Sequence, residues 1–407
     1  MSFKIAYQNK MKAKYTIFSI AFILFIATAC EKLLPVSPED SEVLDGTIKD
    51  LTTTETAQFL RGDVAFTKVF TTSTGLGPLF VSNSCISCHA GDGKGHPSTS
   101  LVRFGQNDET GNHFLMLGGP QLQHRAIIGF NPENIPSGTS HSTFIAPSNT
   151  GLGFLEAVSD ADILALADPD DKDNDGISGV PNWIELPRFL IPKSNAIAKN
   201  GKYIGRFGRK AGAYNLFNQT VNAYNQDMGI VSAYSPNDTY SNEALDPEVS
   251  NAEIADVVHY LQTLKAPIQR NAELVEVKAG KEVFLKIQCA SCHTPSMKTA
   301  TSPIQGLNNK AFAAYTDLLM HDMGKDLDDN YTEGSAKTFE WRTTPLWGLG
   351  LAKDSQGGKV HLMHDGRAKS IEEAILLHGG EGQKSRQNYS ALSSKEKQEL
   401  ITFLENL

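Results

Sequence analysis

The chain has 407 residues, of which 40% are hydrophobic and 20% charged, a globular composition that excludes wholesale disorder and collagen-like repeats. The 37 Lys and Arg residues against 46 Asp and Glu give a formal net charge of -9, so we expect no nucleic-acid partner. A mean hydropathy of -0.27 excludes a polytopic membrane protein. At roughly 150 residues per domain, the length predicts two or three domains.

The N-terminal segment has the pattern of an export signal. Residues 1–14 carry four lysines and no acid, and an apolar run follows at residues 17–27. That run is too short to cross a bilayer as a helix, which needs about 20 apolar residues. We therefore predict a signal peptide over residues 1–29.

The signal ends at Cys30, in the sequence IATAC, which resembles the cleavage and acylation site of bacterial lipoproteins. We expect Cys30 to be lipidated, with simple secretion as the alternative. Residues 30–52 are polar and contain proline, and they read as a lipid-anchored tether. The expected location is the bacterial cell envelope, on a membrane surface facing the periplasm or the outside.

Two Cys-x-x-Cys-His motifs are the strongest chemical signal in the chain. They are Cys85-Ile-Ser-Cys88-His89 and Cys289-Ala-Ser-Cys292-His293. Two thiols at this spacing can each add to a vinyl group of a haem, and the adjacent histidine then reaches the iron. A four-cysteine zinc site would not explain the histidine after each pair, and a redox dithiol needs a βαβ context that is missing. The sequence predicts two covalent c-type haems.

Similar segments surround the two motifs. Stretches containing phenylalanine, at residues 59–70 and 280–284, precede them, and amphipathic stretches at 251–264 and 394–407 close the two halves. We expect a mainly α fold of two cytochrome c-like helical haem domains in tandem, over 53–266 and 267–407. The first domain is longer and should carry a large, loop-rich insert.

An aspartate-rich segment, residues 168–179, lies within that insert. Alternating carboxylates at Asp171, Asp173 and Asp175, with a glycine after the last, can converge on one hard cation. The twelfth position from Asp171 is Asn182 and not glutamate, so the pattern is not a complete EF-hand. We expect calcium here, with a solvated acidic turn as the alternative.

Taken together, the motifs resemble those of the bacterial di-haem oxidoreductases of the peroxidase type, a family also given a thiol-oxidoreductase label. This family is distantly related to di-haem cytochrome c peroxidase and to the methylamine-utilisation di-haem enzymes. The resemblance covers nearly everything after the tether. Besides the aspartate-rich segment, its motifs are GLGPLF (75–80), GLGFLEAV (151–158), GRFGRKAG (205–212), QDMGI (226–230), YTDLLMHDMG (315–324), EWRTTPLWGLG (340–350) and HDGRAKSIEEAILLHGGE (364–381).

The resemblance implies that His89 and His293 are the proximal iron ligands. In the peroxidases the second haem's other ligand follows the HDG motif by one helix, and His378 occupies that place here. The peroxidases commonly have methionine there, so histidine implies a lower reduction potential. Met363 and Met323 are alternative ligands, and a helix-end histidine stabilising the helix dipole is the non-ligand alternative.

The peroxidases also place an acid over the open face of the first haem, in an acid-Met-Gly triplet. Asp227 matches that acid, with aspartate in place of glutamate, and would move a proton between the peroxide oxygens. The alternative role for Asp227 is capping a turn. The peroxidases' tryptophan between the haems is missing from its usual place, where Phe207 and Arg209 stand, and Trp347 is a possible substitute.

The remaining histidines are less informative. His96, His113, His124 and His141 follow the first motif, and any of them could be a removable ligand of the first haem. We expect structural roles for the other three: His259, His361 and, as a partner of a haem propionate, His321.

The function expected from these observations is an exported, haem-dependent oxidoreductase that resembles a peroxidase. Electrons from a donor protein or a small redox molecule would pass through the C-terminal haem to the N-terminal haem, which would act on peroxide or an oxidisable substrate. The alternative is a non-catalytic di-haem electron carrier, with a link to iron handling as a further option. Thiol oxidoreductase activity gains no support, because every cysteine outside Cys30 is assigned to haem.

Overall fold

In the computed structural model the described residues are 37–105, 107–108, 111–112 and 120–407. The predicted signal peptide, Cys30 and His113 lie outside them. The chain divides into two units, Met1–Glu42 and Val43–Leu407, and the second unit contains both Cys-x-x-Cys-His motifs. No helix among the described residues is both long enough and apolar enough to span a membrane.

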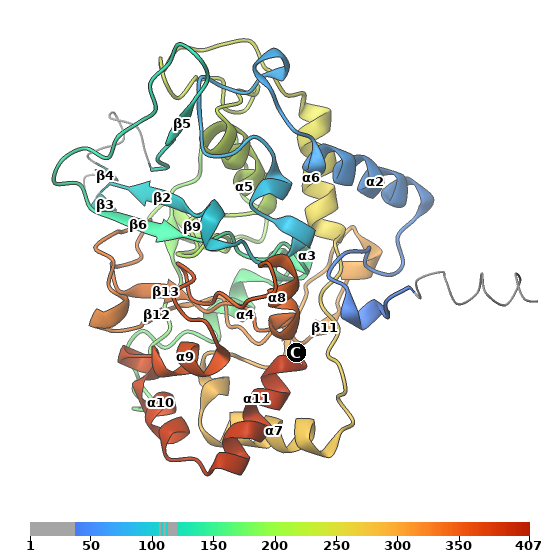
Figure 1. Ribbon diagram of the computed structural model, residues 1–407, viewed down its shortest axis with the longest axis vertical. Helices are drawn as coiled ribbons and strands as arrows, with labels where there is room; N and C mark the ends of the chain where they lie inside the picture. The colour runs from blue at the N-terminus through green and yellow to red at the C-terminus, as the bar shows by residue number, and fades with distance from the viewer. Residues whose placement is uncertain (1–36, 106, 109–110, 113–119) are drawn as a thin grey trace, which may run out of the picture. The chain divides into compact units, whose positions relative to one another are not determined.

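The described helices are mostly short and are joined by long connections (Figure 1). The α-helices are α2 (Thr53–Thr67), α3 (Leu152–Glu156), α4 (Asp160–Leu164), α5 (Leu216–Asn222), α6 (Asn251–Thr263), α7 (Val275–Lys286), α8 (Ala352–Ser355), α9 (Ile371–Leu376), α10 (Gln383–Ser390) and α11 (Ser394–Glu405). Each Cys-x-x-Cys segment forms a 3-10 turn, η3 (Cys85–Ser87) and η7 (Cys289–Ser291), and a π-helical turn, η6 (Ala223–Asp227), follows α5.

The described strands are two to four residues long and pair in small antiparallel sheets. They are β1 (Leu79–Phe80) with β5 (Arg125–Ala126), β2 (Leu101–Phe104) with β6 (His141–Phe144), β3 (Asn107–Asp108) with β4 (Gly111–Asn112), β10 (Met297–Lys298) with β11 (Ala311–Phe312), β12 (Met320–Asp322) with β13 (Glu340–Arg342), and a three-stranded sheet of β7 (Trp183–Ile184), β9 (Lys202–Ile204) and β8 (Ala198–Lys199).

These strands make the described fold a mixture of helices and small sheets, so the expectation of a mainly α fold is right only in part. Most of the strands lie in the first half, where an insert was expected to be loop-rich. Proline and glycine interrupt the hydrophobic pattern there, and the chain can form only short antiparallel pairs between turns. The proposed boundary between residues 266 and 267 stays a prediction.

Two helix pairs of the same design frame the two motifs. Helix α2 packs against α6, and α7 packs against α11 (Figure 1). Gly62 of α2 lies against the Asp256 carbonyl, and Gly280 of α7 lies against the Glu399 carbonyl, with no room for a Cβ at either glycine. Glycine at each crossing therefore lets the two backbones approach closely.

Local sequence explains where α2, α6 and α11 begin. Ser250 caps α6 by accepting a hydrogen bond from the Glu253 amide at 3.1 Å. Thr52 before α2 and Ser393 before α11 each form a capping box with a glutamate three residues later. The start of each of these helices is thus encoded in the residues beside it.

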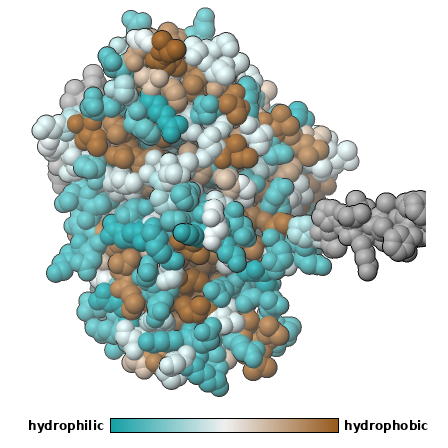
Figure 2. All heavy atoms as spheres, viewed as in Figure 1, coloured by the Kyte–Doolittle hydropathy of each residue, from teal (hydrophilic) through white to brown (hydrophobic). Residues whose placement is uncertain are grey.

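Each helix pair belongs to its own buried apolar cluster. The larger cluster includes Phe66, Tyr260 and Trp347, and the other includes Phe284 and Phe403. The aromatic rings pair in both, with centroids 5.3 Å apart for Phe66 and Tyr260 and 5.5 Å apart for Phe284 and Phe403. On the face shown in Figure 2, apolar residues form small patches among hydrophilic ones.

Candidate haem-binding sites

The first motif opens into a cavity of about 390 Å³, within the size range of cofactor sites. The His89 and Cys88 amides both donate to the Cys85 carbonyl at 3.1 Å, which closes the turn and presents both thiols and the imidazole to the same cavity. Burial lowers the pKa of His89 to about 4. A neutral imidazole is the form that binds a metal.

The second motif repeats this arrangement at a cavity of about 200 Å³. The His293 amide donates to the Cys289 carbonyl at 3.0 Å, and Cys289, Cys292 and His293 all line the cavity. His293 Nδ1 lies 3.0 Å from the Tyr315 carbonyl oxygen. That contact assigns the proton to Nδ1 and leaves Nε2 as the nitrogen able to bind iron.

His378 lies across the second cavity from His293, with ring centroids 6.5 Å apart. Because bonds between imidazole nitrogen and a metal are about 2 Å long, this spacing has room for one ion between the rings. His378 Nδ1 lies 2.7 Å from the Ala374 carbonyl oxygen, so its Nε2 is also left for a metal. Met363 and Met323, the alternative ligands, line the same cavity.

Asp227 ends the π-helical turn η6 and lines the first cavity. Burial raises the pKa of Asp227 to about 7, and the positive charge of Arg103 acts in the opposite direction. Its carbonyl accepts hydrogen bonds from the Val81 and Ser82 amides at 2.7 and 3.0 Å, which fixes the backbone beside the first motif. π-helical turns occur frequently at functional sites.

Three polar side chains that sequence reasoning missed line the first cavity: Arg103, Gln219 and Glu333. Arg103 in β2 donates to Glu333 at 2.9 Å and to the Tyr331 hydroxyl at 3.3 Å, and both Arg103 and Glu333 line the cavity with Asp227. Gln219 of α5 lines it as well. No sequence motif contains these residues, and only the fold brings them together.

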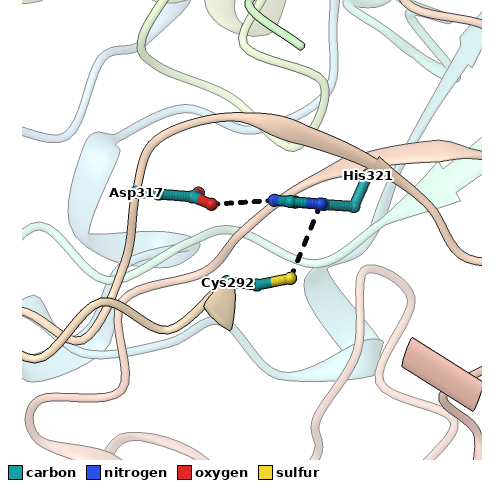
Figure 3. A group of neighbouring side chains, drawn as sticks. All are labelled: Cys292, Asp317 and His321. Carbon is teal, nitrogen blue, oxygen red and sulfur yellow. Dashed lines mark hydrogen bonds and ion pairs between the residues drawn. The ribbon is translucent and has the colours of Figure 1, made fainter. Parts of the chain in front are cut away.

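His321 forms a buried cluster beside the second motif (Figure 3). Its Nε2 lies 2.8 Å from Asp317, its Nδ1 lies 2.5 Å from Glu381, and Cys292 Sγ is 3.5 Å from the same Nδ1. Burial disfavours the charged imidazole, but the hydrogen bonds with Asp317, Cys292 and Glu381 outweigh it and raise the pKa of His321 well above its ordinary value. The two carboxylates hold His321 as a cation, and its expected partnership with a haem propionate stays a prediction.

The aspartate-rich loop brings three carboxylates together. Oxygens of Asp168, Asp171 and Asp173 lie within 4.8 Å of one another, whereas the predicted set had Asp175 in place of Asp168. Asp175 accepts a hydrogen bond from the Ile177 amide at 2.8 Å. Asn182, the twelfth position, is buried and donates to the Lys210 and Glu333 carbonyls, so it faces away from the loop.

The remaining predicted residues are histidines and residues considered as a bridge between the haems. His96, His124 and His141 do not line the first cavity, and His259 Nε2 contacts the Glu55 carbonyl at 3.0 Å, as a structural histidine would. Trp347 lines the first cavity, whereas Trp341 lines the second and stacks on His364 with centroids 3.7 Å apart. Phe207 lines the first cavity only, and Arg209 lines both.

The residues present fit two haem groups. Each cavity has two thiols, the histidine that directly follows them and largely apolar walls, the donor set that covalent haem attachment requires. The four cysteines are free thiols in the structure, and none is paired as a disulfide. Zinc is the poorer fit, because the two cysteine pairs line separate cavities.

Comparison with known proteins agrees with this donor set. Residues 142–407 match the model of the family described as "Di-haem oxidoreductase, putative peroxidase". No curated protein sequence matches the chain. Among solved structures, a MauG-like protein associated with microbial copper homeostasis is similar at 14% identity and a TM-score of 0.41, covering 92% of this chain and 95% of that one.

Hydrazine synthase of Kuenenia stuttgartiensis is similar at 13% identity and a TM-score of 0.38, covering 92% of this chain and 99% of that one. These two likenesses are too distant to carry function. The family match spans well over half of the chain and includes the second motif, Asp227 and His378. The protein belongs to the di-haem oxidoreductase family.

Proposed function

We propose that the protein is an exported di-haem c-type oxidoreductase that reduces peroxide at its N-terminal haem with electrons received through its C-terminal haem. The observation that carries this proposal is the contrast between the two cavities. His293 faces a second imidazole, His378, whereas His89 opens onto a cavity with an acid, Asp227, and no second histidine among the described residues.

The cysteine pairs would hold each haem by thioether bonds, and His89 and His293 would be the proximal ligands. When bound, the haems supply iron for peroxide binding and for electron transfer. Reduction of hydrogen peroxide to two waters consumes two electrons from the donor and two protons. Asp227 would accept the proton of the peroxide oxygen nearest the iron and return it to the far oxygen, which leaves as water.

The first cavity supports this role for Asp227. With a pKa raised to about 7, its carboxyl can both take up and release a proton near neutral pH. Arg103 stays charged beside it through its ion pair with Glu333. The arrangement resembles the positioned acid and cation that assist cleavage of an oxygen–oxygen bond.

Export and cofactor attachment belong to the same proposal. The lysine-rich start, the apolar run at 17–27 and Cys30 support a lipid-anchored protein of the bacterial cell envelope. The electron donor would then be a protein or small redox molecule of that compartment. The calcium proposed for the aspartate-rich loop is supported by the three clustered carboxylates.

Mass spectrometry and haem staining of the denatured protein test the covalent haems. We expect a mass increase of two haem units, and one unit in either Cys85→Ala/Cys88→Ala or Cys289→Ala/Cys292→Ala. A wild-type protein without bound haem would overturn the proposal.

Absorption and electron paramagnetic resonance spectra test whether the two haems have different roles, one in electron transfer and one in peroxide reduction. We expect one high-spin and one low-spin haem, together with peroxide reduction when an artificial donor is supplied. Two low-spin haems and no turnover with any donor would show a non-catalytic electron carrier instead.

A further inference from the structure

Among the residues that the structure describes, four line both cavities: Lys94, Arg209, Arg342 and Thr344. Three of them are cations, although the chain as a whole carries a net charge of -9. They come from distant segments, namely the loop after the first motif, the GRFGRKAG segment and the strand β13 with the residues just after it. The Arg342 amide donates to the Arg209 carbonyl at 3.1 Å, which fixes two of the cations beside each other.

These three cations are buried, each with 8% of its surface exposed. Arg209 donates to the Ile145 carbonyl at 2.8 Å, and Arg342 donates to the Gly208 carbonyl at 3.0 Å. Neither guanidinium forms an ion pair with an acid in the described part of the chain. The Lys94 ammonium has neither an acid nor a carbonyl partner among the residues that the structure describes.

Asp365 acts on Arg209 and Asp317 acts on Arg342 from beyond ion-pair distance. Buried charges without an acid in direct contact are costly, so three together indicate that anionic groups enter the cavities. Burial lowers the pKa of Lys94 to about 7, and that of Arg209 to about 9. The other cation of the first cavity, Arg103, already has its own acid in Glu333 at 2.9 Å. The cations that lack an acid in direct contact are therefore the three that line both cavities.

We infer that Lys94, Arg209 and Arg342 form a shared cationic wall that binds the carboxylate groups of both haems. The inference rests on the proposed pair of haems, each of which carries two propionate carboxylates. Guanidinium groups bind carboxylates with two parallel hydrogen bonds, and the ammonium adds a third point charge. Both haems would then turn their carboxylate edges toward this wall.

A shared wall has a consequence that separate propionate sites would not have. Each cation lines both cavities, so removing one charge would stabilise the oxidised form of both haems and lower both reduction potentials. Cations that line a single cavity act mainly on one haem, because the interaction weakens with distance. Arg103 lines the first cavity alone, and Arg386 lines the second alone.

The experiment is a spectroelectrochemical titration of the holoprotein and its variants. In Lys94→Met we expect the reduction equilibrium of each haem to fall by about tenfold, the effect of one unit charge roughly 10 Å away at an effective dielectric constant of about 20. For a one-electron couple this is about 59 mV. Lys94→Met is the first choice, because it removes no hydrogen bond seen among the described residues. Arg209→Gln should have the same effect, and Arg209→Lys should restore most of it.

The matched controls are Arg103→Gln, expected to move mainly the potential of the first haem, and Arg386→Gln, expected to move mainly that of the second. A shift confined to one haem in both Lys94→Met and Arg209→Gln, or no shift in either, would overturn the shared wall. Haem content by mass is measured on every variant. A protein with two haems and the wrong pattern of shifts refutes this inference alone, whereas a wild type without haems refutes the proposed function.

Discussion

The two candidate haem sites share a frame and differ in the group that faces the proximal histidine. Both use a glycine-mediated helix crossing, at Gly62 and Gly280, and a 3-10 turn that presents two thiols. Across from His293 lies His378, at the end of a helix in the HDG segment, whereas the His89 cavity contains Asp227. The same scaffold would thus offer one haem two histidines and the other one histidine and an acid.

Asp227→Asn should have the largest effect on this contrast, because it removes the proton carrier and keeps the side-chain shape. We expect peroxide turnover to fall by about 10²–10⁴-fold while both haem spectra stay unchanged. In the wild type, the proton-accepting carboxylate predominates above its pKa of about 7, so kcat/KM should rise with pH through about 7. Asp227→Asn should lack that rise, and turnover at the wild-type rate would remove Asp227 from the mechanism.

His378→Met tests the other side of the comparison. Thioether ligation raises the potential of a haem, and the choice of axial ligand is a local effect. Axial ligands change haem potentials over a range of roughly 0.8 V. We expect the potential of one haem to rise by a fraction of that range and the potential of the other haem to stay nearly unchanged. Potentiometric titration followed by absorption measures this, and equal movement of both potentials would contradict ligation of a single iron.

The common frame predicts matched losses of stability. A methyl group at Gly62 or Gly280 meets the backbone of the partner helix, so Gly62→Ala and Gly280→Ala should each cost about 1–3 kcal/mol in free energy of unfolding. Thermal unfolding of the holoproteins measures the effect. Lys281→Ala, at an exposed neighbouring position, is the control and should change little. An unchanged melting temperature in both glycine variants would show that the helices can separate freely.

Removal of calcium should give the smallest effect, confined to the first half. A cation bound only by the folded protein at ten times its Kd contributes about 1.4 kcal/mol, so a chelator should lower the melting temperature slightly. Asp171→Ala/Asp173→Ala should abolish the response to the chelator. A wild type whose melting temperature is the same with chelator and with added calcium would argue for a solvated acidic turn.

The sequence predicted local features well. Helices α6 and α11 lie within the two amphipathic stretches, and η3 and η7 lie at the Cys-x-x-Cys motifs, because capping, periodicity and motif spacing are written in neighbouring residues. Two charged neighbours could not be predicted from the sequence: Arg103, whose charge acts on Asp227, and Glu381, which contacts His321. Arg103 reaches Glu333, and Glu381 reaches His321, through tertiary packing that no local pattern records.

Short strands were missed for a related reason. A pair such as Leu79–Phe80 with Arg125–Ala126 has too few residues to show an alternating pattern, and its stability comes from the surrounding packing. Asp168 was not among the predicted calcium ligands, because spacing along the chain does not show which carboxylates come close together in a folded loop. The role of Asp175 as a ligand stays a prediction.

The π-helical turn that ends at Asp227 has a consequence for how this acid can be gained or lost. Such a turn contains one residue more than the α-helical path would need. Deleting a single residue from η6 would remove that extra residue and allow α-helical winding, so the turn could no longer present the same set of side chains to the first cavity. A one-residue insertion or deletion in this turn, and not only a substitution, would therefore decide whether the proposed proton carrier Asp227 stands at the first cavity.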